Sequence, residues 1–251
     1  MKLVLITGAS SGIGAATARR FAKSGARVIL VARSADALSA LADEIGENAV
    51  PIPADVSDPD AVAALGAAVL TEYGAPDVLI HSAGAGQWKS LSETTPAEAQ
   101  AMMGAPYFAA FNTTQAFLPA MLDRGKGVII SVNSPAGFVS WPGAVGYTAA
   151  RAALRGFHEA LAHDLTGTGV TACHAVFGSV SSPYWENNPA SLDKMPSLDR
   201  LVPRLTPEQC AAVLTQLARQ PRHTAVHPWQ LRLLLASARL FPAFSRRLMR
   251  L

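Results

Sequence analysis

The sequence is poor in cysteine and has no long uninterrupted hydrophobic run. Its two cysteines, Cys173 and Cys210, are far apart and do not have the spacing of metal ligands. They predict a reducing compartment, here the cytoplasm, with neither a disulfide framework nor a metal site. No apolar stretch reaches the length of a membrane-spanning helix. The short apolar run after Met1 meets a glycine-rich turn too early to form the core of a signal peptide.

The sequence also has little excess of positive over negative charge. The net charge of +3 is mild, and no basic stripe with interleaved aromatic residues is present, which argues against a nucleic-acid partner. Half of the 251 residues are hydrophobic, enough for the core of one α/β domain. We therefore expect a protein that acts on a small molecule.

A glycine-rich stretch near the N-terminus is the most informative feature. The apolar run 2–6 predicts a strand and 15–23 predicts a helix, so the glycines lie at a strand-to-helix turn. Gly8 allows a tight turn, Gly12 lets the backbone approach a diphosphate, and Gly14 lets the helix pack close to the strand. An ordinary βα loop is the alternative. The predicted cofactor-binding residues of this turn are Gly8, Ser10, Ser11, Gly12, Ile13 and Gly14.

The spacing Thr-Gly-x-x-x-Gly-x-Gly in residues 7–14 resembles that of the short-chain dehydrogenase/reductase family. The resemblance covers about residues 1–226. It implies a one-domain Rossmann fold and NAD(P)-dependent chemistry between a carbonyl and an alcohol.

Strand-like and helix-like patterns alternate along the rest of the chain. Further strands are predicted at 26–31, 49–53, 77–80, 127–132 and 170–176, and helices near 35–45, 59–73, 96–122 and 147–165. This alternation predicts an α/β fold, a single doubly wound parallel-sheet Rossmann domain spanning 1–251. Residues 179–207 are interpreted as a substrate lid and 228–251 as an amphipathic helical extension. The expected apolar lining of the lid is Tyr184, Trp185, Leu192, Met195 and Leu198.

The end of the second predicted strand indicates the cofactor. An acidic residue there selects NAD, and a basic residue accommodates the 2′-phosphate of NADP. This sequence has Arg33 and no acid at that point, so NADP is preferred over NAD. The alternative is that Arg33 is only a solvated charge. Asp36 is explained as a first-turn residue of a helix capped by Ser34.

Residues after three later strands match other cofactor positions of the family. The resemblance implies that Asp55 bonds the adenine and Val56 packs on it, although an N-cap region is an alternative. Ser82-Ala83-Gly84 is similar to the family's Asn-Asn-Ala-Gly, and the adjoining His81 is interpreted as structural. Phe177-Gly178-Ser179-Val180-Ser181-Ser182 resembles Pro-Gly-x-Val-x-Thr, so the resemblance assigns Gly178, Val180 and Ser182 to the nicotinamide carboxamide.

Three residues match the family's catalytic spacing. Tyr147 follows Ser134 by thirteen residues, and Arg151 follows Tyr147 by four and replaces the family's lysine. Tyr147 and Arg151 therefore project from one face of one helix. Phenols ordinarily titrate near pH 10, so a neighbouring cation is needed to favour the phenolate. The resemblance makes Tyr147 the general acid/base and Ser134 the holder of the substrate oxygen, while Tyr147 and Arg151 also contact the cofactor. A buried Tyr–Arg pair with a loop serine is the alternative.

A second departure concerns the family's active-site asparagine. The stretch Thr114-Gln115-Ala116-Phe117-Leu118-Pro119-Ala120-Met121 matches the family, and counting back from it places Pro106 at the asparagine. Proline has no side-chain amide and would bend a helix. Asn112 is a less favoured substitute.

The leading prediction is NADPH-dependent reduction of a ketone or aldehyde, or the reverse reaction. Because Pro106 and Arg151 alter the catalytic tetrad, the alternative is a cofactor-binding protein with isomerase- or dehydratase-type chemistry, or with none. The family implies a homodimer or homotetramer through the long helices. The basic C-terminal stretch is expected to close over the substrate pocket or to pack on a neighbouring subunit, with peripheral membrane contact as the less favoured alternative.

Overall fold

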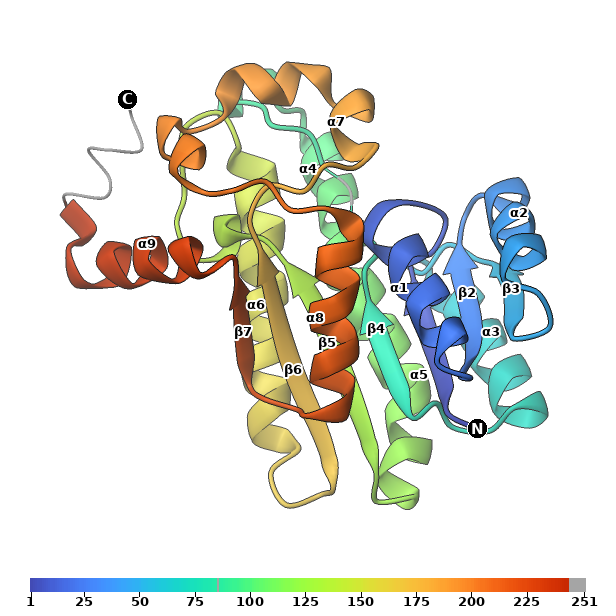
Figure 1. The fold of residues 1–251 in the computed structure, drawn as a ribbon. Coiled ribbons are helices and arrows are strands. Elements are labelled where there is room, and N and C mark those ends of the chain that lie inside the picture. The colour runs from blue at the N-terminus through green and yellow to red at the C-terminus, as the bar shows by residue number, and fades with distance from the viewer. Residues whose placement is uncertain (85, 244–251) are drawn as a thin grey trace.

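The computed structural model describes residues 1–84 and 86–243 and contains one seven-stranded parallel sheet (Figure 1). The strand order is β3-β2-β1-β4-β5-β6-β7, and every neighbouring pair is parallel. The predicted doubly wound α/β fold is confirmed. The strands are β1 (Leu3–Thr7), β2 (Arg27–Ala32), β3 (Ala49–Pro53), β4 (Val78–His81), β5 (Gly127–Asn133), β6 (Val170–Phe177) and β7 (Thr224–His227).

Helices cover both faces of this sheet. The core on one face joins α1, α2 and α8, and the core on the other joins α3, α5 and α6. The helices are α1 (Gly12–Lys23), α2 (Ala35–Ile45), α3 (Pro59–Glu72), α4 (Pro96–Met103), α5 (Ala109–Asp123), α6 (Val145–Asp164), α7 (Tyr184–Asn187), α8 (Pro207–Arg219) and α9 (Trp229–Leu240).

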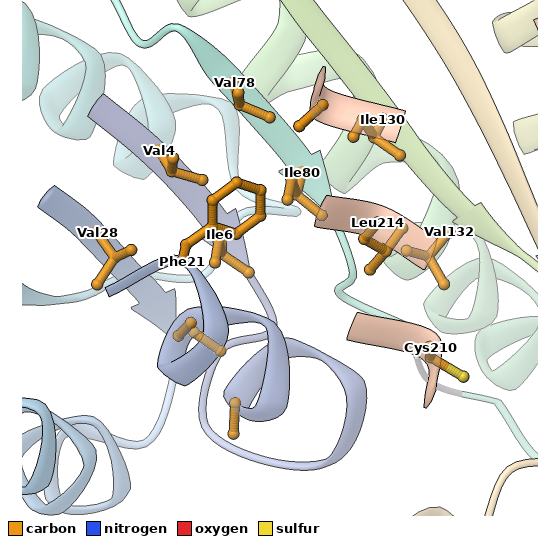
Figure 2. Packing of buried hydrophobic residues seen from close by; sticks show 14 of the residues in the cluster. Val4, Ile6, Phe21, Val28, Val78, Ile80, Ile130, Val132, Cys210 and Leu214 are labelled. Carbon is orange, nitrogen blue, oxygen red and sulfur yellow. The ribbon is translucent and has the colours of Figure 1, made fainter. Parts of the chain in front are cut away.

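The side chains of β1 explain why the sheet is buried on both sides. Val4 and Ile6 belong to the same buried cluster as Phe21 of α1 and Leu214 of α8 (Figure 2). Leu5 points to the opposite face and joins the core there. A strand buried on both faces is a continuous apolar run rather than an alternating one, as the sequence of β1 shows.

The glycine turn after β1 is shaped by close backbone approach. Gly8 has φ +67°, and a Cβ there would lie 2.7 Å from backbone atoms of Ala83. A Cβ on Gly14 would overlap the carbonyl oxygen of Gly8. The tight turn expected at Gly8 and the close packing expected at Gly14 are both present. The Thr7 hydroxyl connects the end of β1 to the loop after β4, because it donates to Ile80 O at 3.4 Å and accepts from Ala83 N at 3.3 Å.

The predicted single helix over 96–122 is wrong. The structure has α4, then a π-helical turn at Gly104–Phe108, then α5, and Ala105 leaves the helical region with φ −128° and ψ 111°. The proline ring of Pro106 excludes the preceding residue from the helical conformation, which explains the break.

The segment after β6 forms the lid and the C-terminal helix. Short helical turns at Pro189–Lys194 and Ser197–Leu201 follow α7 and lie above the carboxyl end of the sheet, and α9 extends beyond β7 (Figure 1). The part of the predicted C-terminal extension at 244–251 lies outside the described residues. Over the described ranges, no helix has the length and apolar character needed to traverse a bilayer.

We predict that Gly14→Ala destabilises the protein by about 1–3 kcal/mol, because the added methyl group overlaps the Gly8 carbonyl. Gly156→Ala is the matched control. Gly156 lies inside α6 with open space around it, so the same substitution should stabilise by about 0.5–1 kcal/mol. Urea unfolding of both variants measures the difference, and equal effects would contradict this account of the turn.

Candidate functional site

A cleft of about 820 Å³ lies at the carboxyl edge of the sheet. This volume is near the upper end of the roughly 300–1,000 Å³ that is usual for ligand pockets. The cleft brings together all the residues that the sequence predicted for cofactor and catalysis. They are Gly8, Ser10, Ser11, Gly12, Ile13, Gly14, Arg33, Asp55, Val56, Ser82, Ala83, Gly84, Ser134, Tyr147, Arg151, Gly178, Val180 and Ser182.

Arg33 and Asp55 lie at the β2–β3 end of the cleft. Arg33 is exposed directly after β2, and Ser34 caps α2 by accepting a hydrogen bond from Ala37 N at 3.4 Å. The hydroxyl and amide of Ser57 donate to Asp55 Oδ1 at 2.7 and 2.9 Å. These hydrogen bonds hold the pKa of Asp55 below its usual range, and the charge of Arg33 adds to the effect. A cation and a carboxylate thus share this end of the cleft.

Ser134 is positioned by Asn133, a residue that the sequence did not single out. The Ser134 amide donates to Asn133 Oδ1 at 2.8 Å. Asn133 Nδ2 donates to the backbone oxygen of Arg151 at 3.0 Å and lies 3.0 Å from His174 Nε2. One amide side chain therefore connects β5, α6 and β6 beneath the site. The Ser134 hydroxyl accepts from Ala136 N at 3.2 Å, which leaves its own hydrogen for another acceptor.

Arg151 lies over the ring of Tyr147. Its guanidinium carbon is 5.0 Å from the ring centroid, and both side chains are buried in the cleft wall. The glycine at Gly84 makes room, because a Cβ there would lie 2.6 Å from Arg151 Nη2. Nη1 donates to Val132 O at 3.4 Å, and Nε is buried without a partner among the described residues. The guanidinium lines the cleft and makes a single long hydrogen bond to the protein backbone.

Aromatic side chains surround the Tyr147 end of the cleft. Trp88 is buried, and its ring centroid lies 5.1 Å from Trp141, 5.7 Å from Tyr147 and 5.7 Å from Trp185. Tyr184 approaches Tyr147 at 6.4 Å, and burial together with the nearby Tyr147 raises the pKa of Tyr184 above its usual range. Trp88 and Trp141 were missed from the sequence, since both lie in loops without a periodic pattern.

Hydrogen bonds hold the lid against the loop after β4. Tyr184 Oη donates to Gly86 O at 2.8 Å, and the amide of Trp88 donates to the Ser191 hydroxyl at 3.2 Å. Trp185 Nε1 donates to Val180 O at 2.8 Å. Tyr184, Trp185, Met195 and Leu198 line the cleft as predicted, but Leu192 does not and is 44% exposed. The expectation for Leu192 is therefore wrong, because its short helical turn directs that side chain to the surface.

The C-terminal helix adds an apolar wall. Leu231, Leu234 and Leu235 of α9 line the cleft, and Leu231 packs with Val202 of the lid. The expectation that this segment closes over the pocket thus agrees with the described part of the helix.

The two candidates for the altered asparagine position do not line the cleft. Pro106 is buried, and only its neighbours Gly104 and Ala105 reach the lining. Asn112 donates to the carbonyl oxygens of Val56 and Ser57 at 3.3 and 3.1 Å. Asn112 therefore holds the loop after β3.

Three histidines are buried beneath the site. His81 lies 3.3 Å from both the Ser131 and Thr114 hydroxyls, which agrees with its structural interpretation. His158 and His174 stack with ring centroids 4.5 Å apart. Burial lowers the pKa of His81 to about 3, of His174 to about 3 and of His158 to about 4, so all three are neutral near pH 7.

Comparison with known sequences identifies relatives. The family model described as short chain dehydrogenase matches residues 2–193. A short chain dehydrogenase of Pseudocercospora fijiensis is 36% identical over 199 residues, an alignment that covers 72% of this chain and 60% of that protein. The chain therefore spans about three fifths of the length of this relative.

Solved structures share the fold. A short-chain dehydrogenase from Streptomyces avermitilis superposes with a TM-score of 0.83 at 27% identity and covers 97% of both chains. An alcohol dehydrogenase from the archaeon Thermococcus sibiricus, solved with 5-hydroxy-NADP, gives a TM-score of 0.79 at 26% identity and covers 90% of this chain and 95% of that chain.

We predict that the buried histidines make stability fall as the pH is lowered from about 7 to 5. Between the unfolded pKa near 6.5 and the folded values near 3–4, the unfolded chain binds protons that the folded chain does not. Each such histidine contributes a slope of about 1.4 kcal/mol per pH unit below its unfolded pKa. Urea unfolding at several pH values should show a shallower slope for His174→Asn than for the unchanged protein. His163→Asn, at an exposed position, is the control, and equal slopes for the two variants would contradict the assignment.

Proposed function

This chain belongs to the short-chain dehydrogenase family, and we propose that it reduces an apolar ketone or aldehyde with NADPH, or catalyses the reverse oxidation. The observation that carries the proposal is the Arg151 guanidinium lying 5.0 Å from the Tyr147 ring centroid, inside the cleft that also contains the glycine turn. This contact brings a buried positive charge and a phenol together in the cleft, the two groups that the proposed acid/base role needs.

The residues of the chain fit a nicotinamide nucleotide. The helix start after Gly12 would present free backbone N–H groups to a diphosphate, and the Arg151 guanidinium, which lines the cleft, would suit ribose hydroxyls. When bound, this cofactor supplies or takes up the hydride. We assign the part of the cleft lined by Arg33, the glycine turn and Ser182 to the cofactor. The part around Tyr147 is then left for the substrate.

Ser134 and Tyr147 would handle the substrate oxygen. The Ser134 hydroxyl has a free hydrogen to donate to it, while Tyr147 gives its proton to the oxygen in reduction and removes it in oxidation. Asn133 holds the backbone of Ser134 and of Arg151 in place, because it bonds the Ser134 amide and the Arg151 carbonyl at once.

Arg151 changes how Tyr147 regains its proton. A guanidinium supplies charge and donors but does not release a proton in proteins. Since neither Pro106 nor Asn112 lines the cleft, the described chain has no asparagine relay at that point. We infer that the proton returns to Tyr147 from solvent entering the cleft.

NADP is the proposed cofactor. Arg33 directly follows β2, is exposed and lines the cleft, and the strand itself ends without an acidic residue. A guanidinium there suits a 2′-phosphate. The archaeal structural neighbour was solved with an NADP derivative, which supports the same choice.

The lining favours an apolar, preferably aromatic substrate. Trp88, Trp141 and Trp185 face the Tyr147 end, and Leu231 and Leu234 close one side. Flat aromatic walls bind rings through offset or edge contacts.

We also propose a homo-oligomer. Phe108 and Phe111 are each 45% exposed and gather with Tyr107 and Phe157 on the surface of the Gly104–Phe108 turn, α5 and α6. An aromatic patch of this kind on two long helices is typical of a protein interface.

Tyr147→Phe should lower the rate of hydride transfer from NADPH to a carbonyl by about 10²–10⁴-fold, because the general acid is removed. Tyr73→Phe, outside the cleft, is the control and should leave the rate unchanged. Single-turnover stopped-flow absorbance measures both. Full activity in Tyr147→Phe would contradict the assigned role and favour a protein that binds the nucleotide without redox turnover.

Arg33→Asp should weaken NADP binding by about 10- to 100-fold and change NAD binding little, because it replaces a charge-assisted phosphate contact by a repulsive charge. Arg20→Asp on the exposed side of α1 makes the same charge change away from the cleft and should have no such effect. Calorimetric titration with both nucleotides measures the shift. Tighter binding of NAD than of NADP by the unchanged protein would show that the cofactor assignment is wrong.

A further inference from the structure

The C-terminal helix α9 has two apolar faces rather than one. Leu231, Leu234 and Leu235 form the inner face and line the cleft. Because a helix turns about 100° per residue, Trp229, Leu233 and Leu240 fall in an arc of about 40° on the other side. We call these three residues the outer stripe.

The outer stripe is open to solvent. Trp229 is 64% exposed, Leu233 is 61% exposed and Leu240 is 72% exposed, and Phe241 directly after the helix is 63% exposed. Figure 1 shows α9 extending away from the sheet beyond β7, so the body of the protein does not cover this side. Four large apolar side chains on one projecting element are more than the scattered exposure of an ordinary surface.

The charged residues of α9 are all of one sign. Arg232 and Arg239 are exposed and lie on one flank of the outer stripe, about 60–80° around the helix from its edge. After Glu208 the sequence contains seven arginines and no aspartate or glutamate: Arg219, Arg222, Arg232, Arg239, Arg246, Arg247 and Arg250. An apolar stripe flanked by arginine and free of acid complements a surface that is negatively charged and apolar beneath.

We propose that the outer stripe of α9 docks the protein on an anionic lipid bilayer. Trp229, Leu233, Leu240 and Phe241 enter the headgroup region, and Arg232 and Arg239 contact the acidic headgroups. The contact is peripheral, since α9 has twelve residues and no described helix could cross a bilayer. The inner face of the same helix is a wall of the cleft, so docking places that wall beside the lipid.

The charge of α9 favours an acidic lipid surface over a second copy of the chain as the partner of the outer stripe. A pair of α9 helices packed through their outer stripes would bring arginines toward arginines, with no acidic residue in α9 to offset them. An acidic lipid surface has the opposite charge. The aromatic patch on α5 and α6 is a separate surface and serves for the oligomer proposed above.

Sedimentation with vesicles tests the proposal on the full chain. The vesicles are phosphatidylcholine alone, or an equal mixture of phosphatidylcholine and phosphatidylserine. The protein should bind the mixed vesicles and release at high salt. Trp229→Ser with Leu233→Ser, and separately Arg232→Glu with Arg239→Glu, should each weaken binding at least about tenfold.

Matched controls carry the same changes elsewhere. Leu91→Ser alters a 74% exposed leucine, and Arg20→Glu with Lys23→Glu reverses two exposed charges on α1. These variants should bind as the unchanged protein does. None of the substituted residues lines the cleft, so NADPH oxidation with a water-soluble carbonyl substrate should continue in all of them. Absence of that activity in the unchanged protein would count against the proposed function and not against docking.

Three outcomes would overturn the docking proposal. They are no binding to the mixed vesicles, equal binding to both kinds of vesicle, and binding that the outer-stripe variants leave unchanged. Sedimentation equilibrium without lipid tests the competing explanation, in which the outer stripe binds a second copy of the chain. A mass that falls on Trp229→Ser with Leu233→Ser, together with no vesicle binding, would assign the stripe to a second copy of the chain.

Discussion

The contact between the turn after β1 and the loop after β4 is the constraint on which the site depends. At this point the strand order reverses, because β1 lies between β2 and β4 and the crossovers diverge to opposite sides. The Gly8 backbone lies so close to Ala83 that a Cβ would not fit, and the Thr7 hydroxyl bridges the two loops. The start of α1 and the residues after β4 and β5 therefore open onto one cleft.

The chemistry at that cleft depends on a cation held in place by packing rather than by an ion pair. Arg151 lies between the ring of Tyr147 and the backbone at Gly84, and its hydrogen bond to the frame is the weak one to Val132 O. Asn133 fixes the backbone of Arg151 and the amide of Ser134 together. A guanidinium in this position can direct its charge and its N–H donors toward a ligand in the cleft. Hydrogen bonds through Tyr184 and Ser191 hold the lid beside this charge, against the loop after β4.

Local patterns in the sequence predicted six of the seven strands, all but β7, and the cofactor and catalytic residues that line the cleft, because strand ends and helix starts position them directly. Gly8, Arg33 and Tyr147 each follow from one element and its boundary. A bend at Pro106 was expected, but the division of the segment into α4 and α5 was missed, since the restraint that proline places on Ala105 competes with a strongly helical neighbourhood. Trp88, Trp141 and Asn133 were missed for another reason: their contacts come from loops and strands far apart in the chain, and no spacing records them. The two faces of α9 follow from its periodicity only once the cleft shows which face is inside.

The central claim is that this cleft transfers a hydride from NADPH to a carbonyl carbon. The most direct test is mass spectrometry of the alcohol formed from an aromatic ketone with NADPH deuterated at either hydrogen of nicotinamide C4. Our account predicts that one of the two labelled cofactors places a single deuterium on the carbinol carbon, and that the other places none. Stoichiometric binding of NADPH with no deuterium in any product, across a panel of apolar ketones and aldehydes, would contradict it.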